Sequence, residues 1–414
     1  MATVAMLGTL DTKGAEFQWM RSQLEGLGHR VHLIDAGVAG EPVGACETTR
    51  DEVARLAGTS IRELIQDDDR GKALAAMSAG AAQAVAELAR NGSIDGFLSA
   101  GGSGGSSIAA AAMEVLPVGF PKLLVSTMAS GDVSPYVGAS DVTIMYSVVD
   151  IAGINRLSKA VLGNAVAAIA GMAERYAGRE PEPDERPLVA ASMFGVTTPA
   201  VEACRTIIED AGYEVLVFHA TGAGGRALEG LAAGGFLAGV LDLTTTELAD
   251  ELVGGVLTAG PDRLTAAGSH GIPQVVSLGA LDMVNFGARD TVPPRFASRL
   301  LYEHNATVTL MRTTAEESAQ LGEIVGRKLA AASGPTALVV PGRGVSALDT
   351  SGGLFEDPAA DEALTSAAIA AVAGSAVEVV QVDAHINDPE FARAAAETLL
   401  RYLTVSEENK NAEN

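Results

Sequence analysis

Short apolar segments alternate along the chain with longer segments in which apolar residues recur at helical spacing. Such alternation predicts an α/β fold with mainly parallel, doubly wound sheets that carry helices on both faces. Long helices are expected from residue 107 onward and over residues 155–176. The expected strands are residues 4–7, 30–34, 94–100, 123–126, 188–192, 214–218, 239–243, 274–277, 307–311, 337–340 and 377–382.

Residues 177–187 contain three prolines and six charged residues, so they fit neither a core helix nor a central strand. We therefore expect a domain of residues 1–177, a linker of residues 178–187 and a second domain of residues 188–405. Both domains begin with a strand, a Gly/Thr loop, a helix, a glycine and a strand, which predicts an internal repeat of βαβ units. Residues 406–414 are expected to form a polar, frayed tail.

The formal net charge is −24, which argues against nucleic acid or a bare membrane surface as the main partner. A polyanionic ligand would then need a local device, such as a glycine nest, a helix N-terminus or a single Lys. Cys46 and Cys204 are the two cysteines, and neither a disulfide framework nor a zinc site is expected. They fit a reducing cytosol, so a cytoplasmic location is expected. The sequence predicts no membrane span.

The first candidate loop lies between an expected strand and a helix and contains Gly8, Thr9, Asp11, Thr12 and Lys13. Helix-start amides, two hydroxyls, a Lys and a carboxylate together could hold a triphosphate and its Mg²⁺. The loop lacks the GxxxxGK[ST] pattern of a Walker A motif. In the alternative interpretation, Asp11 or Thr12 caps the helix and Lys13 is a solvated charge.

The second candidate loop follows the expected strand 94–100 and precedes a helix. It consists of Gly101, Gly102, Ser103, Gly104, Gly105, Ser106 and Ser107. Glycines let several backbone N–H groups approach one anion, and serines add hydroxyl donors. A flexible turn is the alternative. Asp132 follows the next strand and could complete the same crevice near a metal or a ribose.

A third loop, residues 222–227, matches the dinucleotide fingerprint GxGxx[GA], and Asp242 follows it after about twenty residues. This match supports a dinucleotide-dependent oxidoreductase as an alternative function. The helix expected after the loop is short and interrupted by Gly230, Gly234 and Gly235, which argues against that alternative.

A fourth group of polar residues is spread over the ends of the second domain's expected strands. The group contains His270, Asp282, Asn285, Arg312, Arg343, Ser346, Asp349, His385 and Asn387. If loops bring them to one end of the sheet, Arg312 and Arg343 could clamp a small acidic metabolite, and His270 or His385 could act as acid or base. If each arginine is instead paired with a neighbouring Asp or Glu, the cluster is structural.

Several of these motifs resemble the family of the tomato mosaic virus resistance protein, whose bacterial members are labelled uncharacterised. The motifs are residues 8–13, 101–105, 128–132, 218–225, 281–286, 304–305, 310–314 and 386–391, and the resemblance covers nearly the whole chain. It implies two Rossmann-like domains, ATP bound with Mg²⁺ in the N-terminal one, and homodimers. It places the nucleotide at Gly8, Thr9, Asp11, Thr12 and Lys13 with the nest from Gly101 to Ser106. Inhibition of viral replication belongs to the plant member and is not carried over.

Two further functions remain open on the sequence beside the oxidoreductase alternative. One is an ATP-binding regulatory subunit or sensor of small-molecule metabolism. The other is an enzyme that acts on a small carboxylate or sugar acid at the second domain. Turnover distinguishes them, because a sensor binds ATP without releasing ADP or phosphate.

Overall fold

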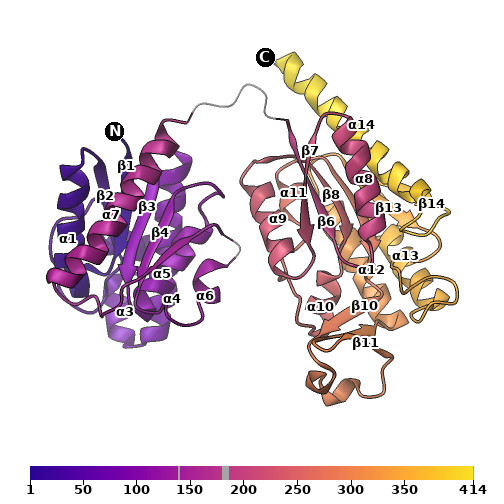
Figure 1. Cartoon of the computed structure of the whole chain (residues 1–414), viewed down its shortest axis with the longest axis horizontal. Coiled ribbons are helices and arrows are strands. Elements are labelled where there is room, and N and C mark those ends of the chain that lie inside the picture. The colour runs from indigo at the N-terminus through magenta and orange to yellow at the C-terminus, as the bar shows by residue number, and fades with distance from the viewer. Residues whose placement is uncertain (139, 180–185, 414) are drawn as a thin grey trace. The chain divides into compact units, whose positions relative to one another are not determined.

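The computed structural model describes residues 1–138, 140–179 and 186–413, with only the backbone course for residues 407–413. The chain divides into two compact units, Met1–Glu182 and Pro183–Asn414, which we call domain 1 and domain 2 (Figure 1). Most of the expected linker lies outside the described residues. Each domain is described by itself below.

Domain 1 is a parallel five-stranded sheet in the order β2-β1-β3-β4-β5, with helices on both faces. Its strands are β1 (Thr3–Gly8), β2 (Arg30–Asp35), β3 (Gly96–Gly101), β4 (Lys122–Ser126) and β5 (Thr143–Tyr146). Its helices are α1 (Leu10–Gly26), α2 (Arg50–Leu56), α3 (Ile61–Asp67), α4 (Arg70–Arg90), α5 (Ser103–Glu114), α6 (Ser134–Val137) and α7 (Arg156–Ala177).

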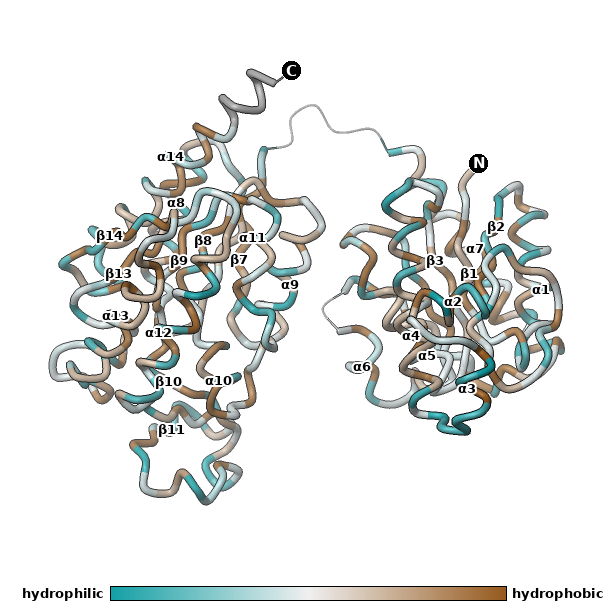
Figure 2. Tube along the Cα trace, turned by 180° about the vertical axis from the view of Figure 1, so that it is seen from behind, coloured by the Kyte–Doolittle hydropathy of each residue, from teal (hydrophilic) through white to brown (hydrophobic). Residues whose placement is uncertain are grey.

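Strand β1 shows why this segment forms a central strand. Every residue of β1 is buried, and its side chains alternate between the two faces of the sheet. Val4 and Met6 pack in one core with α1 and α7, whereas Ala5 and Leu7 pack in the other core with α4 and α5. Figure 2 shows the hydrophobic residues concentrated in the strands and the hydrophilic ones mostly in outer turns and helices.

Domain 2 has a parallel six-stranded sheet in the order β14-β13-β9-β8-β6-β7 and a small antiparallel sheet in the order β10-β12-β11. Its strands are β6 (Leu188–Met193), β7 (Glu214–His219), β8 (Leu237–Thr244), β9 (Gln274–Gly279), β10 (Met283–Phe286), β11 (Leu301–Asn305), β12 (Val308–Arg312), β13 (Thr336–Pro341) and β14 (Glu378–Val382). Its helices are α8 (Thr198–Asp210), α9 (Ala223–Ala233), α10 (Glu247–Val253), α11 (Ala266–Ser269), α12 (Ala315–Ala330), α13 (Pro358–Val372) and α14 (Pro389–Glu413), with short 3₁₀ turns at Arg289–Thr291 and Pro294–Phe296.

The α/β fold with mainly parallel sheets confirms the sequence prediction, and three local expectations differ. The expected strand 307–311 is β12 of the antiparallel sheet, because a short turn joins it to β11, and β10 pairs with its other edge. Strands β5, β10 and β11 were not expected, since they are short or carry polar side chains. Helix α14 extends to Glu413 through the tail expected to be frayed, which contains neither Gly nor Pro to end a helix.

In both parallel sheets, the order in which strands are added reverses at the first strand. In domain 1, β2 lies on one side of β1 and β3 on the other. In domain 2, β7 and β8 flank β6 in the same way, so the predicted internal repeat is present in the strand order. Ligands of doubly wound sheets bind at such a switch point, outside the carboxyl ends of the strands. The candidate positions are therefore the loops after β1 and β3, and the loops after β6 and β8.

Candidate functional site

The two glycine-containing loops of domain 1 leave the sheet side by side at its switch point. Strands β1 and β3 are paired through Leu7 and Ser99, and the Ser99 hydroxyl donates a hydrogen bond of 2.8 Å to the Leu7 carbonyl. The loop that begins at Thr9 and the loop that begins at Gly102 therefore start next to each other. Both lead directly into helices, α1 and α5, which begin at this edge of the sheet.

The start of α5 presents unpaired backbone donors. The amide of Ser106 bonds to the Gly102 carbonyl at 2.8 Å, but the amides of Ser103, Gly104 and Gly105 have no acceptor among the described residues. A Cβ on Gly101 would lie only 3.0 Å from the Cα of Gly105, so this close approach requires glycine. Free amides at a helix N-terminus form an anion-binding arrangement.

The start of α1 adds hydroxyls and an amine to the same edge. Thr9 and Thr12 lie with their hydroxyl oxygens 2.8 Å apart, and Thr12 is exposed. Lys13 departs from helical geometry, with φ −131° and ψ 19°. Its Nζ donates a hydrogen bond of 2.5 Å to the Ile151 carbonyl, so one of its three N–H groups is used and Lys13 is not simply solvated.

Two other residues of the first loop hold the loop in place. Gly8 is buried under Phe17, because a Cβ there would lie 2.2 Å from the phenylalanine ring. Asp11 Oδ2 accepts hydrogen bonds from the amides of Ala39 and Gly40, at 2.7 and 3.2 Å. Asp11 Oδ1 is buried and has no hydrogen-bond partner among the described residues.

Ser106 and Asp132 face other partners than the sequence interpretation expected. The buried Ser106 hydroxyl lies 2.7 Å from that of Ser126, between α5 and β4, so it is not part of the nest surface. Asp132 is exposed and accepts a hydrogen bond of 2.9 Å from the Ser134 amide at the start of α6. Bonds from Ser134 lower the pKa of the Asp132 carboxyl. Both residues therefore stabilise local structure.

Two residues that the sequence interpretation missed lie beside the nest. A Cβ on Gly104 would be 3.9 Å from Arg70 Nη2, and a Cβ on Gly102 would be 3.7 Å from the Thr127 hydroxyl. Arg70 is exposed and forms no ion pair with a described residue. Thr127 directly follows β4, which is the signal that could have identified it. Arg70 belongs to α4, a helix that contributes no strand-end loop, so its sequence position gave no comparable signal.

In domain 2 the switch point is closed by its own side chains. Thr197 and Thr244, in the loops after β6 and at the end of β8, lie with their hydroxyls 2.8 Å apart, and both are fully buried. Ser192 donates a hydrogen bond of 2.6 Å to Asp242. In contrast to the nest of domain 1, these groups satisfy one another.

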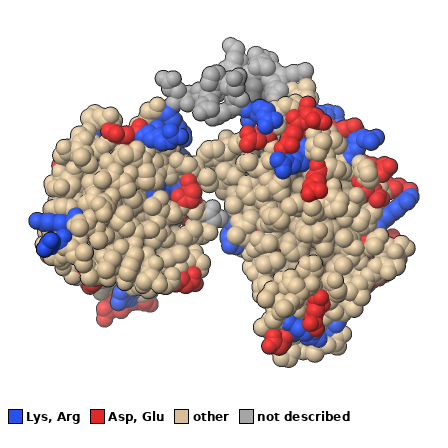
Figure 3. Space-filling model, viewed as in Figure 1, with Lys and Arg blue, Asp and Glu red and all other residues tan. Residues whose placement is uncertain are grey.

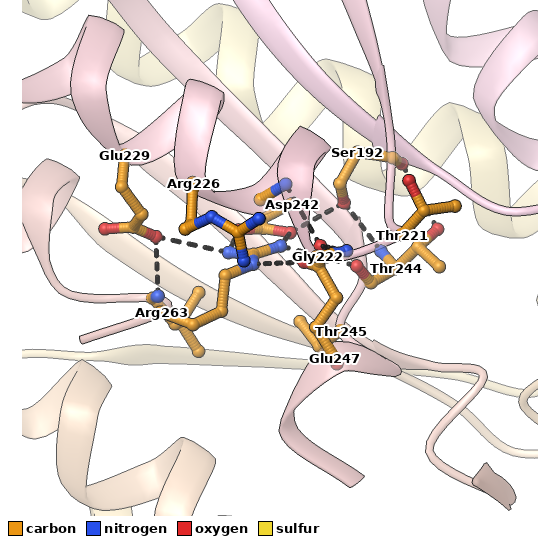
Figure 4. Close-up of polar contacts among 12 residues, drawn as sticks. Ser192, Thr221, Gly222, Arg226, Glu229, Asp242, Thr244, Thr245, Glu247 and Arg263 are labelled. Atoms are coloured by element: carbon orange, nitrogen blue, oxygen red, sulfur yellow. Dashed lines mark hydrogen bonds and ion pairs between the residues drawn. The ribbon is translucent and has the colours of Figure 1, made fainter. Parts of the chain in front are cut away.

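Arg263 lies at the centre of this buried network (Figure 4). Its fully buried guanidinium contacts three carboxylates, those of Asp242 at 2.7 Å, Glu247 at 2.6 Å and Glu229 at 3.3 Å. Burial alone would lower the pKa of Arg263, but these carboxylates raise it well above its ordinary value. The guanidinium therefore stays charged and neutralises part of the buried negative charge.

The same network accounts for the loop that matches the dinucleotide fingerprint. The amides of Gly222 and Gly225 donate hydrogen bonds of 2.7 and 3.0 Å to Glu247 Oε1, where a pyrophosphate would be expected. A Cβ on Gly225 would lie 2.2 Å from Glu247 Oε2, which explains the glycine. Asp242 binds Arg263 and Ser192 instead of standing free for a ribose. The oxidoreductase alternative loses the observation that supported it.

The polar residues of domain 2 do not form the expected clamp. Arg343 is paired with Asp383 at 2.8 Å, and Arg312 is paired with Asp361 at 2.7 Å. Because each arginine is already paired with an aspartate, the pairs indicate a structural role for both arginines. His270 precedes β9 and therefore lies at the opposite end of the parallel sheet from Arg343, where its Nδ1 lies 2.9 Å from the Ala266 carbonyl. The expectation that it joins the others was wrong.

Ser346 and His385 do lie together at the carboxyl ends of β13 and β14, where both side chains form hydrogen bonds within the protein. His385 Nε2 is 2.8 Å from the Ser346 carbonyl, and its Nδ1 accepts a hydrogen bond from the Asn387 amide. The Ser346 hydroxyl donates to Asp282 Oδ2 at 2.7 Å. These contacts hold the loop after β13 against the loop after β14.

Asp282 predicts a pH dependence of stability. Burial, and then the nearby Asp349, raise the pKa of the Asp282 carboxyl from 3.8 to about 7. Between these pH values the folded state keeps a proton that the unfolded state releases, so the free energy of unfolding falls as the pH rises from about 4 to about 7. Urea unfolding at several pH values should show a shallower dependence for Asp282→Asn. If the free energy of unfolding depends on pH as steeply in Asp282→Asn as in the exposed control Asp290→Asn, the prediction is contradicted.

The parallel sheet of each domain, with helices on both of its faces, defines a two-domain α/β protein with Rossmann-like domains. The helices among the described residues include none long and apolar enough to span a bilayer. Family models for the N-terminal and C-terminal domains of the uncharacterised protein family UPF0261 match residues 2–178 and 186–403. The chain belongs to this family, which confirms the resemblance seen in the sequence.

Three similar proteins illustrate the relationship. A UPF0261 protein of Clostridium tetani is 51% identical over 401 residues, covering 97% of this chain and 98% of the relative. The ToMV resistance protein Tm-1(GCR237) of Solanum lycopersicum is 40% identical over 433 residues, covering 99% of this chain but 56% of the tomato protein. A solved UDP-N-acetylglucosamine 2-epimerase is 12% identical, covers 88% of this chain and 90% of its own, and has a TM-score of 0.24, which carries no argument.

Proposed function

We propose that domain 1 binds ATP with Mg²⁺ at the switch point between β1 and β3, with the phosphates on the nest from Gly101 to Gly105. The observation that carries the proposal is the set of free amides at Ser103, Gly104 and Gly105, directly beside the start of α1. Three convergent N–H groups at a helix N-terminus suit a phosphate. The resemblance of this chain to its family adds ATP as the specific nucleotide.

Local cations are needed because the protein as a whole is strongly acidic. On the face seen in Figure 3, Lys and Arg side chains lie in small separate groups and not in a broad basic patch. Arg70, on α4, lies beside the nest, and Lys13, on α1, lies at the same edge of the sheet. We assign them to the phosphates as charge-assisted donors, with Thr9 and Thr127 as hydroxyl donors.

Mg²⁺ fits this arrangement through the nucleotide. Mg²⁺ is commonly held by one or two carboxylates together with substrate phosphates. Asp11 supplies an unpaired, buried carboxylate oxygen in the first turn of α1, and Gly37 packs directly against it. Asp11 is therefore the carboxylate assigned to the ion, which would neutralise part of the phosphate charge.

Calorimetric titration of ATP with Mg²⁺ tests the proposal. Lys13→Ala and Arg70→Ala should each weaken ATP binding by about 1.5 to 3 kcal/mol, the range for a hydrogen bond to a charged group. Arg62→Ala is the matched control, since Arg62 is an exposed arginine on the neighbouring helix α3. Equal affinity in all three variants and the wild-type protein would remove the site.

A regulatory or sensing role in small-molecule metabolism is the physiological role we infer, with a homodimer in the cytoplasm as its setting. The unpaired amides at the start of α5 support a nucleotide site in domain 1, while the domain 2 switch point is filled by its own side chains. An enzyme acting on a small carboxylate at domain 2 is less well supported, because Arg312 and Arg343 are already paired. Release of ADP during incubation with ATP would favour the enzyme.

A further inference from the structure

Domain 2 contains a cavity of about 810 Å³ that the proposed nucleotide site does not use. It lies at the carboxyl ends of β13 and β14 and at the start of α13. This volume is in the range of small-molecule sites. The charged residues that line it are Arg343, Asp349, Glu356, Asp361, Glu362 and Asp383.

The balance of charge in the cavity disfavours an anionic ligand. Arg343 is the one cation in the lining, and Asp383 binds it through two hydrogen bonds, both of 2.8 Å. The remaining charged groups in the lining are carboxyl groups. An acidic metabolite would find no free cation there, whereas a positively charged ligand would find several acceptors.

Asp349 and Asp361 are two carboxyl groups that lie beside one guanidinium, that of Arg312. The Asp349 side chain is only 2% exposed yet lines the cavity, and its Oδ2 accepts the Val345 amide at 2.9 Å. The Asp349 and Asp361 carboxyl groups also lie close enough to form a hydrogen bond with each other. Arg312 Nη2 remains 3.8 Å from Asp349 Oδ1, because the same nitrogen donates to Asp361 Oδ1 at 2.7 Å.

A third carboxyl group, that of Asp282, lies buried behind the residues that line the cavity. Asp282 is completely buried next to this pair, and its Oδ1 has no partner among the described residues. Arg312 pairs with Asp361 and Asp349, and its positive charge also acts on Asp282. Burial, and then Asp349, raise the pKa of Asp361 from 3.8 to about 7, so the pair retains a proton near neutral pH. That proton neutralises one of the two carboxyl groups, as a bound cation could.

We propose that this cavity binds a small organic cation, with an ammonium group held between Asp349 and Asp361. The incoming N–H groups would donate to Asp349 Oδ1 and to Asp361, and the proton shared by the two carboxyls would leave to solvent. An organic cation is favoured over a metal ion, because the described residues include no group of three or more His, Cys, Asp or Glu side chains placed to hold one. The hydroxyls of Thr350 and Thr365, which also line the cavity, add polar contacts.

The test is a calorimetric titration of the full chain with putrescine and agmatine, without nucleotide, at pH 7 and physiological salt. Repeating it in two buffers with different ionisation enthalpies measures proton release. We expect one cation per chain, a net release of protons, and binding at least about tenfold weaker in Asp361→Asn. Glu397→Gln removes the same charge from an exposed site on α14 and should bind as the wild-type protein does, which controls for general attraction to an acidic protein.

Thr365→Phe gives a second variant that leaves all carboxylates in place and fills part of the cavity. It should abolish binding of both probes while the thermal midpoint stays close to that of the wild-type protein. If Asp361→Asn fails to fold, Thr365→Phe decides the proposal. Absence of binding, equal loss in Glu397→Gln, binding without proton release, or preferential binding of succinate would each overturn it. None of these outcomes depends on ATP.

Discussion

Replacing Arg263 by Ala is expected to destabilise domain 2 by about 3 to 5 kcal/mol, the cost of leaving buried charges without their partner. The guanidinium is fully buried and contacts the carboxylates of Asp242, Glu247 and Glu229. Without it, Asp242 and Glu247 would remain buried with no cation beside them. Urea unfolding followed by circular dichroism measures the loss.

Arg327→Ala is the matched control for this prediction. Arg327 is 65% exposed and pairs with Glu323 one helical turn away, so its loss should change stability by no more than about 0.5 kcal/mol. If Arg263→Ala costs less than about 1 kcal/mol, the network is no stronger than a surface ion pair, and its role as the centre of domain 2 is refuted.

Replacing Gly104 by Asp is expected to abolish ATP binding without harming the fold. A Cβ at Gly104 meets nothing closer than 3.8 Å, and the backbone there has no left-handed conformation, so a side chain fits. A carboxylate in the first turn of α5 interacts favourably with the helix N-terminus. It would occupy the free amides and neutralise Arg70, and thereby exclude the phosphates. Affinity should fall at least about tenfold, with the thermal midpoint unchanged or raised.

Gly104→Asn separates the effect of charge from that of size. Asn has nearly the same shape as Asp but leaves the anion site uncharged, so it should retain more ATP affinity than the Asp variant. If both variants bind ATP as tightly as the wild-type protein, the phosphates do not lie on the α5 amides.

The nest of domain 1 could be predicted from sequence because its signal is local. A glycine-rich segment between a buried strand and a helix places N–H groups at the carboxyl end of that strand, wherever the rest of the chain lies. The residues from Gly101 to Gly105 therefore occupy the position expected of them. The hydroxyl of Ser106 turns toward Ser126 instead. Its partner lies on the neighbouring strand β4, so the loop sequence alone could not predict this contact.

Long-range pairing explains what could not be predicted. The segment from Gly222 to Gly225 has the local pattern of a phosphate loop, yet its amides bind Glu247, which comes from the helix after the next strand. Arg312 and Arg343 are likewise neutralised by aspartates 49 and 40 residues away. Arg70 reaches Gly104 from a different helix. None of these partners is fixed by spacing along the chain.

The most direct measurement is a crystal structure of the full chain with ATP and Mg²⁺. The account predicts phosphate density on the amides of Ser103, Gly104 and Gly105, with Lys13 and Arg70 within hydrogen-bond distance of phosphate oxygens. A nucleotide bound elsewhere, or a nest that stays free at saturating ATP while calorimetry shows binding, would contradict it.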